Sequence, residues 1–511
     1  MITQRAGRRE WIGLAVLILP TLLLSIDVTV LHLAVPALSE DLRPTGAQLL
    51  WINDIYGFLI AGFLIPMGTL GDRIGRRRLL LTGAAAFALA SALAAYAPSA
   101  EVLIAARAAL GVAGATLMPS TLSLIRTMFH DPAQRTTAIS LWMVGFTGGM
   151  VIGPLVGGML LESFWWGSAF LLGVPVMAVL LVLGPLLLPE FRSPGAGRAD
   201  ALSVVLSVVA ALAVTHGVKE LAAGGAARSG LLSLAVGTVL AVVFVRRQRR
   251  LAEPLLDLRL FAERRFSGAL GTLMLVILVG PGIGLLAAQY LQLVLGLSPL
   301  EAGLWMLPNT VLVIVGFVAT PALARRVRPA VLGAAGLVLG AAGVLLLTTA
   351  GTYGLPALVT GHALFFLGGS PLLVLGTDIV VGAAPEERAG SAAALSETAQ
   401  EFGGAAGLAV FGSIAAAVYQ ARLRVPDEIP AEAAEAARDT LGGAIAVASG
   451  QPAGVAATLA DGARAAFTSG LTATAVAAAV VLLAAAVLAA VTLRHVPRLA
   501  SPEPEVSEAH R

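Results

Sequence analysis

Two long apolar segments are joined by the stretch Gly68-Thr69-Leu70-Gly71-Asp72-Arg73-Ile74-Gly75-Arg76-Arg77-Arg78. This stretch holds five charged residues and three glycines, and it is too short to form a domain. Such a turn is typical of a cytoplasmic connection between two membrane helices, because arginines stay on the cytoplasmic side and small residues let helices pack closely. The sequence therefore predicts an all-α polytopic membrane protein.

The composition of the whole chain favours the same class. Of 511 residues, 58% are hydrophobic and only 12% are charged, and the mean hydropathy is +0.89. These values exclude a set of soluble domains. The chain has no cysteine, which excludes disulfides, thiolate metal sites and a cysteine nucleophile. The first apolar run, 11–33, is longer than the roughly 7–15 residues of a signal-peptide core, so it is predicted to be an uncleaved membrane helix.

Apolar stretches of about 17–25 residues are long enough to cross a membrane as helices. Fourteen are predicted, at 11–36, 50–70, 79–97, 103–125, 138–160, 168–188, 201–218, 230–246, 267–292, 303–324, 330–349, 355–381, 393–419 and 470–492. With the N-terminus inside, cytoplasmic segments carry 25 of the 33 Lys and Arg residues, external segments carry seven, and Arg107 lies within a helix. This asymmetry follows the positive-inside rule and predicts that both termini are cytoplasmic.

The predicted helices divide into two bundles of six and an inserted pair, and many transporters consist of two such halves around a midplane site. The predicted segments are a cytoplasmic N-terminus (1–10), an N-terminal bundle (11–188), an inserted pair (201–246), a C-terminal bundle (267–492) and a cytoplasmic tail (493–511). The long external loop 420–469 is predicted to form a helical hairpin, with a disordered loop as the alternative.

The turn at 68–78 contains residues that its location on the cytoplasmic side does not explain. An arginine-rich cytoplasmic turn explains Arg76–Arg78, but it explains neither the three glycines nor Asp72. The stretch resembles the signature loop of the major facilitator superfamily, G-x-L-x-D-R-x-G-R-[KR], which implies that it fastens the two bundles together while the cavity opens outward. Asp72 is expected to pair with an arginine or to bind a helix N-terminus of the opposite bundle. The implied switch residues are Gly68, Asp72, Arg73, Gly75, Arg76 and Arg77.

Asp27 lies in the outer half of the first predicted helix. A carboxylate within a membrane costs about 2.5–3.5 kcal/mol on insertion scales and is functional by default. The surrounding residues 24–36 resemble the L-D-x-T-V-x-x-x-A-x-P pattern of fourteen-helix drug exporters, which implies that Asp27 binds substrate or protons. The alternative is a structural acid that nearby hydroxyl groups, such as that of Thr29, satisfy.

Arg107 lies inside the fourth predicted helix, where it needs a partner or a water-filled cavity. Its surroundings resemble the R-x-x-x-G motif of the superfamily. Asp27 and Asp54 are the acids of the outer half that could pair with it. The alternative, which is compatible, is that Arg107 supports the first helix through hydrogen bonds to backbone carbonyls.

The fifth predicted helix contains the glycine-rich run Gly145-Phe146-Thr147-Gly148-Gly149-Met150-Val151-Ile152-Gly153-Pro154-Leu155-Val156-Gly157-Gly158. Since each glycine costs a helix about 1 kcal/mol relative to alanine, this density indicates that another helix lies against the backbone and that the proline bends the axis. The alternative is a generic kinked helix. The run resembles the antiporter motif G-x-x-x-G-P-x-x-G-G of exporters, which implies export. The motif residues are Gly145, Gly149, Gly153, Pro154, Gly157 and Gly158.

Further acids are predicted to line a central cavity. Asp54 lies near the outer end of the second helix, beside Trp51 and Tyr56, and Asp378 lies in the twelfth helix. An acidic and aromatic cavity with few cations suits lipophilic cations, which carboxylates and aromatic rings both attract.

Glu397 and Glu401 are four residues apart and therefore share one face of the thirteenth predicted helix. Their segment resembles the corresponding helix of quaternary-ammonium exporters. Asp378, Glu397 or Glu401 is predicted to carry the coupling proton. The alternative for each is a role as an ordinary interfacial residue.

Several function classes find no support in the sequence. No P-loop motif occurs, and the one lysine, Lys219, lies outside every glycine-rich loop, so ATP-driven export by this chain is excluded. Six scattered histidines show no metal-ligand spacing. We therefore expect no enzyme activity, no metal, no cofactor, no nucleic-acid partner and no ATP. The expected partners are protons, small molecules and the lipid bilayer, and the expected working unit is a monomer.

The resemblance covers residues 11–492 and points to the fourteen-helix drug:proton antiporter family of the major facilitator superfamily. It implies the major facilitator fold, the cytoplasmic membrane of a bacterium, and export of quaternary ammonium compounds, dyes or antibiotics. One alternative is a dedicated exporter of a self-made antibiotic or other metabolite. Another is a non-transporting membrane sensor of drugs, against which the intact antiporter motif argues.

Overall fold

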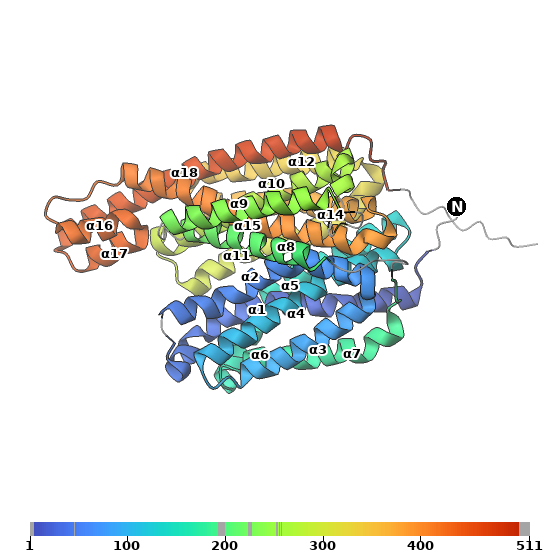
Figure 1. The fold of residues 1–511 in the computed structure, drawn as a ribbon. Coiled ribbons are helices and arrows are strands. Elements are labelled where there is room, and N and C mark those ends of the chain that lie inside the picture. Colours follow the sequence, from blue (N-terminus) through green and yellow to red (C-terminus); the bar gives the residue numbers. More distant parts are fainter. Residues whose placement is uncertain are drawn as a thin grey trace, which may run out of the picture.

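The computed structural model describes residues 5–44, 46–192, 200–222, 227–251, 254, 256 and 258–499. Within these ranges the chain forms helices and no strands. The helices run roughly alongside one another in two bundles, with the N-terminal residues at one end of the molecule (Figure 1). The predicted all-α class is confirmed for the described part of the chain.

The N-terminal bundle follows the predicted order. It consists of α1 (Arg8–Leu42), α2 (Gly46–Ile74), α3 (Arg76–Ala95), α4 (Ala100–Met128), α5 (Pro132–Ser163), α6 (Ser168–Leu171) and α7 (Gly173–Leu187). Local sequence explains the helix starts, because the Ser99 and Asp131 side chains accept hydrogen bonds from the first backbone N–H groups of α4 and α5. Gly75 separates α2 from α3 with φ at 112°, a conformation that favours glycine. Gly75 therefore shapes the turn between the two helices.

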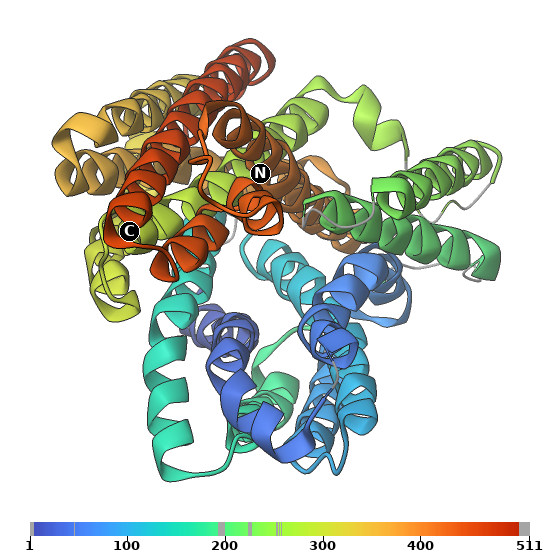
Figure 2. The same ribbon diagram turned by 90° about the vertical axis from the view of Figure 1, so that its left-hand side faces the viewer.

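The inserted pair consists of α8 (Ala201–Ala222) and α9 (Ala227–Gln248). These helices contact each other, and α8 also contacts α2 and α15 (Ala389–Arg422), one helix from each bundle. Next to the start of α8, Asp200 accepts a 2.7 Å hydrogen bond from the guanidinium of Arg247, in the last turn of α9. This bond holds the pKa of the Asp200 carboxyl group well below its ordinary value. Figure 2 shows the pair at the side of the two bundles.

The C-terminal bundle completes the structure. Its long helices are α10 (Arg264–Gln289), α11 (Pro299–Arg326), α12 (Pro329–Leu346), α14 (Leu355–Ala383), α15 and α18 (Ala453–Thr492). Its short elements are η1 (Leu258–Ala262), η2 (Tyr290–Val294), η3 (Leu347–Thr349), α13 (Ala350–Tyr353), η4 (Glu386–Arg388), α16 (Ala431–Asp439) and α17 (Leu441–Ser449).

Thirteen helices of the described chain are long and apolar enough to cross a membrane. The remaining predicted span, 201–218, corresponds to α8, whose apolar stretch Leu202–Val218 is shorter. A multi-pass architecture is thus shown, while the exact count of fourteen and the cytoplasmic termini stay predictions. Most of the predicted tail, from residue 500 on, lies outside the described residues.

The loop 420–469 is helical, as predicted, and the disordered alternative is wrong. The α16–α17 hairpin packs against the start of α18, and the Tyr419 hydroxyl group donates a 2.8 Å hydrogen bond to the Ala437 carbonyl. α18 has 40 residues and begins well before the predicted start at 470, because its first turns are part of this hairpin structure. The hairpin lies at one end of the molecule, which we call the hairpin end (Figure 1). The opposite end, which we call the turn end, holds the turn between α2 and α3.

Candidate functional site

An ion pair between α1 and α4 lies inside the N-terminal bundle. Arg107 Nη1 donates a 2.7 Å hydrogen bond to Asp27 Oδ2, and Arg107 Nε donates to the Ile52 carbonyl at 3.2 Å. The guanidinium also lies 4.4 Å from the centre of the Tyr56 ring. Arg107 is only 1% exposed, so Asp27 supplies the countercharge that a buried cation requires.

The proposed alternative for Asp27 is not observed. The Thr29 hydroxyl group donates to carbonyls of its own helix, at 2.9 Å to Ile26 and 3.3 Å to Ser25. Asp27 is instead paired with Arg107, which was one of the contacts considered for that arginine. The backbone carbonyl that Arg107 binds belongs to Ile52 of α2 and not to the first helix.

The two aromatic candidates of α2 have different surroundings. Tyr56 is buried at 3% exposure beneath the Arg107 guanidinium, so one face of its ring is already occupied by a cation. Trp51 is 47% exposed and stands edge-on to Phe58, with ring centres 6.3 Å apart. Of these two rings, only that of Trp51 is open to a substrate. The side chain of Asp54 lies outside the described residues.

The glycines of α5 bring α1 against its backbone, as the sequence predicted. A Cβ atom added at Gly145, Gly149, Gly153 or Gly157 would overlap Ile18, Ser25, Thr29 or Val30 of α1, respectively. These four glycines are spaced by four residues and form one stripe, which positions the helix that carries Asp27. A Cβ atom at Gly158 would meet nothing within 4 Å, so this member of the motif is not part of the contact. The side chain of Pro154 lies outside the described residues.

Asp72 joins the two bundles at the turn end. Its carboxylate accepts 3.0 Å hydrogen bonds from the backbone N–H groups of Gly390 and Ser391, at the N-terminus of α15 in the opposite bundle. It also accepts a 3.2 Å hydrogen bond from Arg76 Nε. Both partners expected for Asp72, an arginine and a helix N-terminus, are therefore present. Gly68 makes this approach possible, since a Cβ atom there would lie 2.5 Å from the Gly390 carbonyl oxygen.

Arg76 extends the contact from α3. It is 0% exposed and donates to Thr127 Oγ1 at 2.6 Å and to the Glu386 carbonyl of the opposite bundle. Arg77 turns the other way and donates to the Leu188 carbonyl at 3.0 Å, within its own bundle. Arg73 is half-buried at the end of α2. Asp72 and Arg76 thus form hydrogen bonds between the bundles, whereas Arg77 binds the chain just after the end of α7.

Asp378 occupies a different environment from the predicted acidic vestibule. It is 5% exposed, pairs with Arg135, and accepts a 2.7 Å hydrogen bond from Thr136 Oγ1. Both partners belong to α5, so Asp378 forms a second contact between the bundles at the turn end. The structure does not bring it into an open group with the other acids. Arg135 could not be recognised from its sequence surroundings, because it looks like one more topology-setting cation of a cytoplasmic loop.

Glu397 and Glu401 lie on α15, beyond the Asp72 contact in the direction of the hairpin end. Glu397 is 7% exposed, whereas Glu401 is exposed. Within the described residues, no cation lies within ion-pair distance of Glu397. Of the predicted acids described here, Asp27 and Asp378 thus have arginine partners, and Glu397 is a nearly buried carboxylate without one.

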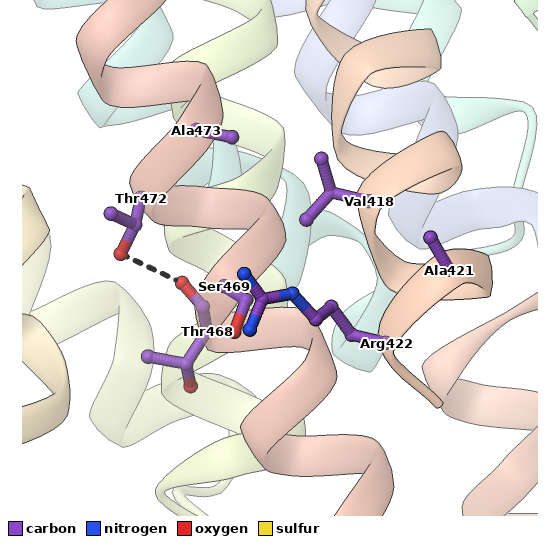
Figure 3. A pocket seen from close by; sticks show the side chains of 7 residues that line it. All are labelled: Val418, Ala421, Arg422, Thr468, Ser469, Thr472 and Ala473. Carbon is purple, nitrogen blue, oxygen red and sulfur yellow. Dashed lines mark hydrogen bonds between the residues drawn. The ribbon is translucent and has the colours of Figure 1, made fainter. Parts of the chain in front are cut away.

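A cavity of about 440 Å³ lies apart from these acids, between α15 and α18 at the hairpin end. Its lining includes Arg422, Thr468 and Ser469, and the Arg422 side chain reaches across it (Figure 3). Glu401 lies 21 residues before Arg422 on α15, which corresponds to roughly 30 Å along a helix. The cavity is therefore not part of the acidic site.

The switching role that the signature-loop resemblance implies predicts that Asp72→Asn slows the transport of every substrate alike and leaves equilibrium drug binding unchanged. Asparagine keeps one acceptor oxygen but loses the charge that strengthens the bonds to Gly390 and Ser391, so transport should slow by about tenfold. Transport rates and binding constants for two unlike drugs test this, with the exposed Asp427→Asn as the matched control. Loss of binding for one drug alone would count against a switching role.

Two helical bundles joined at one end, with ionisable residues inside their helices, define a membrane transporter of the two-bundle class. The family model described as Major Facilitator Superfamily matches residues 17–408. The chain belongs to the major facilitator superfamily, whose members are transporters of small molecules and not enzymes. It is a multi-pass cell-membrane protein of bacterial type.

The relatives include a multidrug efflux pump, a methyl viologen resistance protein and an antibiotic resistance and export protein. The chain is 46% identical to the multidrug efflux pump LfrA of Mycolicibacterium smegmatis, over 96% of this chain and 98% of that protein. It is 36% identical to the methyl viologen resistance protein SmvA of Salmonella typhimurium, over 90% and 93%. It is 33% identical to the tetracenomycin C resistance and export protein of Streptomyces glaucescens, over 84% and 79%.

Solved structures show the same fold at low sequence identity. The human organic anion transporter MFSD10 superposes with a TM-score of 0.63 at 16% identity, over 94% of this chain and 99% of that one. The recognition of a major facilitator protein from the sequence is thus confirmed.

Proposed function

We propose that this protein is a proton-coupled antiporter that exports lipophilic, cationic drugs across the cytoplasmic membrane. The observation that carries the proposal is Glu397, a carboxylate of 7% exposure inside a membrane helix, without a cation partner among the described residues. Such a group binds either a proton or a cationic substrate at little cost, because both remove an otherwise unpaired charge.

The turn end is the cytoplasmic end in this proposal, because the arginine clusters of the sequence follow the positive-inside rule there. The contacts of Asp72, Arg76 and Asp378 join the two bundles at that end. A transporter closed at its cytoplasmic end is in an outward-facing state. The resemblance to the signature loop assigns Asp72 to this state, and the observed contacts support that role.

Coupling requires that the carboxylate binds either a proton or the drug, and never both at once. The proton gradient supplies about 2.3 kcal/mol per charge per 100 mV and about 1.4 kcal/mol per pH unit. One proton exchanged for one monovalent cation moves no net charge, so only the pH term would drive that exchange. No cofactor takes part in this scheme, and a single chain is the working unit.

The proposed substrates are quaternary ammonium compounds, cationic dyes and antibiotics. LfrA is named a multidrug efflux pump and SmvA a methyl viologen resistance protein, and both relatives cover nine tenths or more of this chain. The exposed Trp51 ring offers a face for a lipophilic cation. The tetracenomycin C exporter favours a second candidate, export of a self-made antibiotic. A biosynthetic gene cluster beside the gene would support that candidate.

Efflux of ethidium from loaded cells tests the proposal directly. Cells that produce the protein should lose ethidium faster than cells without it, and a protonophore should abolish the difference. Efflux that persists after the proton gradient is collapsed would contradict proton coupling, and unchanged retention would contradict drug export.

We expect Glu397→Gln to uncouple drug movement from the pH gradient. Glutamine preserves the size of the side chain but cannot bind or release a proton, so substrate-induced proton release should fall by about tenfold or more. Downhill drug exchange should continue. The measurement is proton release from reconstituted vesicles on adding drug, for Glu397→Gln, Glu401→Gln and Asp378→Asn in parallel. Full proton release from all three variants would indicate that Asp27, and none of these three acids, couples drug export to proton movement.

A further inference from the structure

A buried hydrogen-bonded pair joins α11 and α14 inside the C-terminal bundle. Asn309 Nδ2 and His362 Nδ1 lie 2.7 Å apart, and Asn309 Nδ2 also lies 3.0 Å from Met306 Sδ. Both Asn309 and His362 are 5% exposed. The imidazole stands edge-on to Phe366, with ring centres 5.0 Å apart. The pair is thus a polar group held among apolar side chains.

The pair leaves one hydrogen-bond donor and one acceptor unused. Within the described part of the chain, His362 Nε2 and Asn309 Oδ1 are buried atoms without a hydrogen-bond partner. Because the Asn309 amide nitrogen donates to Nδ1, the neutral imidazole carries its hydrogen on Nε2, which makes Nε2 a donor. Asn309 Oδ1 is an acceptor. A buried polar group without a partner destabilises a structure, and two such atoms in one place can bind a ligand that offers both an acceptor and a donor.

The position of the pair connects it to the space between the bundles. Val313 follows Asn309 by four residues and Phe366 follows His362 by four, so each shares a helix face with its polar neighbour. Val313 and Phe366 both pack with the hydrophobic core of the N-terminal bundle. Asn309 and His362 therefore lie on the same two helix faces as Val313 and Phe366, one helical turn closer to the hairpin end.

We infer that Asn309 and His362 form a substrate subsite for an uncharged group with one acceptor and one donor, such as an amide. The amide oxygen would accept from His362 Nε2, and the amide N–H would donate to Asn309 Oδ1. This subsite complements the carboxylates, which attract positive charge. It rests on the proposed export of drugs and adds the recognition of neutral polar groups to it.

The test compares two substrates in cells that produce Asn309→Leu, His362→Gln or the wild-type protein. Puromycin contains an amide, whereas tetraphenylphosphonium is a cation without hydrogen-bonding groups. Asn309→Leu should lower puromycin efflux by about tenfold relative to tetraphenylphosphonium efflux, because a site built to hydrogen-bond loses most when its polar group is removed. His362→Gln keeps a donor and should lose less. Tetraphenylphosphonium efflux also reports whether each variant folds.

An equal effect of Asn309→Leu on both substrates, or no effect on either, would overturn the subsite, because a packing contact or a structural water predicts no selectivity. Wild-type export of tetraphenylphosphonium without puromycin would overturn the amide assignment. Failure of the wild-type protein to export either compound would instead contradict the proposed function itself.

Discussion

Asp27→Asn is expected to reduce ethidium efflux to the background rate of cells that lack the protein. Asparagine cannot neutralise Arg107, which is 1% exposed and donates a 2.7 Å charged hydrogen bond to Asp27. Removing one partner of a buried ion pair costs about 3–5 kcal/mol, enough to abolish a transport cycle that depends on this geometry. Efflux at equal membrane abundance is the measurement, with Asp27→Glu as the charge-preserving control.

A double variant separates the two roles of Asp27. In Asp27→Asn/Arg107→Gln, no buried charge is left unpaired, and glutamine can still donate to the Ile52 carbonyl. If Asp27 binds substrate or protons, export stays at background in the double variant. Recovery of export would show that Asp27 serves only to neutralise Arg107. Wild-type efflux from the single variant would refute an essential role of any kind.

Gly149→Ala is expected to lower the rate of drug efflux by at least about tenfold, because overpacking costs roughly 1–3 kcal/mol. The added Cβ atom would overlap Ser25 Oγ, which can rotate away, and the Leu22 carbonyl oxygen, which is backbone and cannot. α1 and α5 would have to separate, which displaces the helix that carries Asp27.

Gly158→Ala is the matched control in the same motif. Its added methyl group would meet nothing within 4 Å, so efflux should be unchanged. Rates are compared at equal membrane abundance. Similar losses from the two variants would mean that the glycines matter for some reason other than the contact with α1.

The sequence was sufficient for the overall architecture because its signals are physical requirements of the membrane. Long apolar stretches predicted the helices, and the glycine spacing in α5 predicted close contact with another helix. The contacts of Asp72 could be anticipated because a carboxylate among arginines at a helix turn has few possible partners. The weakest span was 201–218, where the apolar stretch of α8 is short.

Tertiary partners were not predictable from the sequence. Asp378 looked like a cavity acid, but Arg135 and Thr136, more than 240 residues earlier in the chain, neutralise and bind it. Tyr56 looked open to substrates, but Arg107 covers its ring. Asn309 and His362 carry no motif, and only their contact across two helices distinguishes them. Each of these depends on which helix faces bundle packing brings together.

Drug uptake into reconstituted vesicles under an imposed pH gradient tests the central claim most directly. In vesicles with the turn end outside and an acidic lumen, we expect ethidium accumulation that stops when nigericin dissipates the gradient. Glu397→Gln should abolish the accumulation and preserve exchange of ethidium down its own gradient. Accumulation by the wild-type protein that is independent of the pH gradient, or undiminished in Glu397→Gln, would contradict proton-coupled export through this carboxylate.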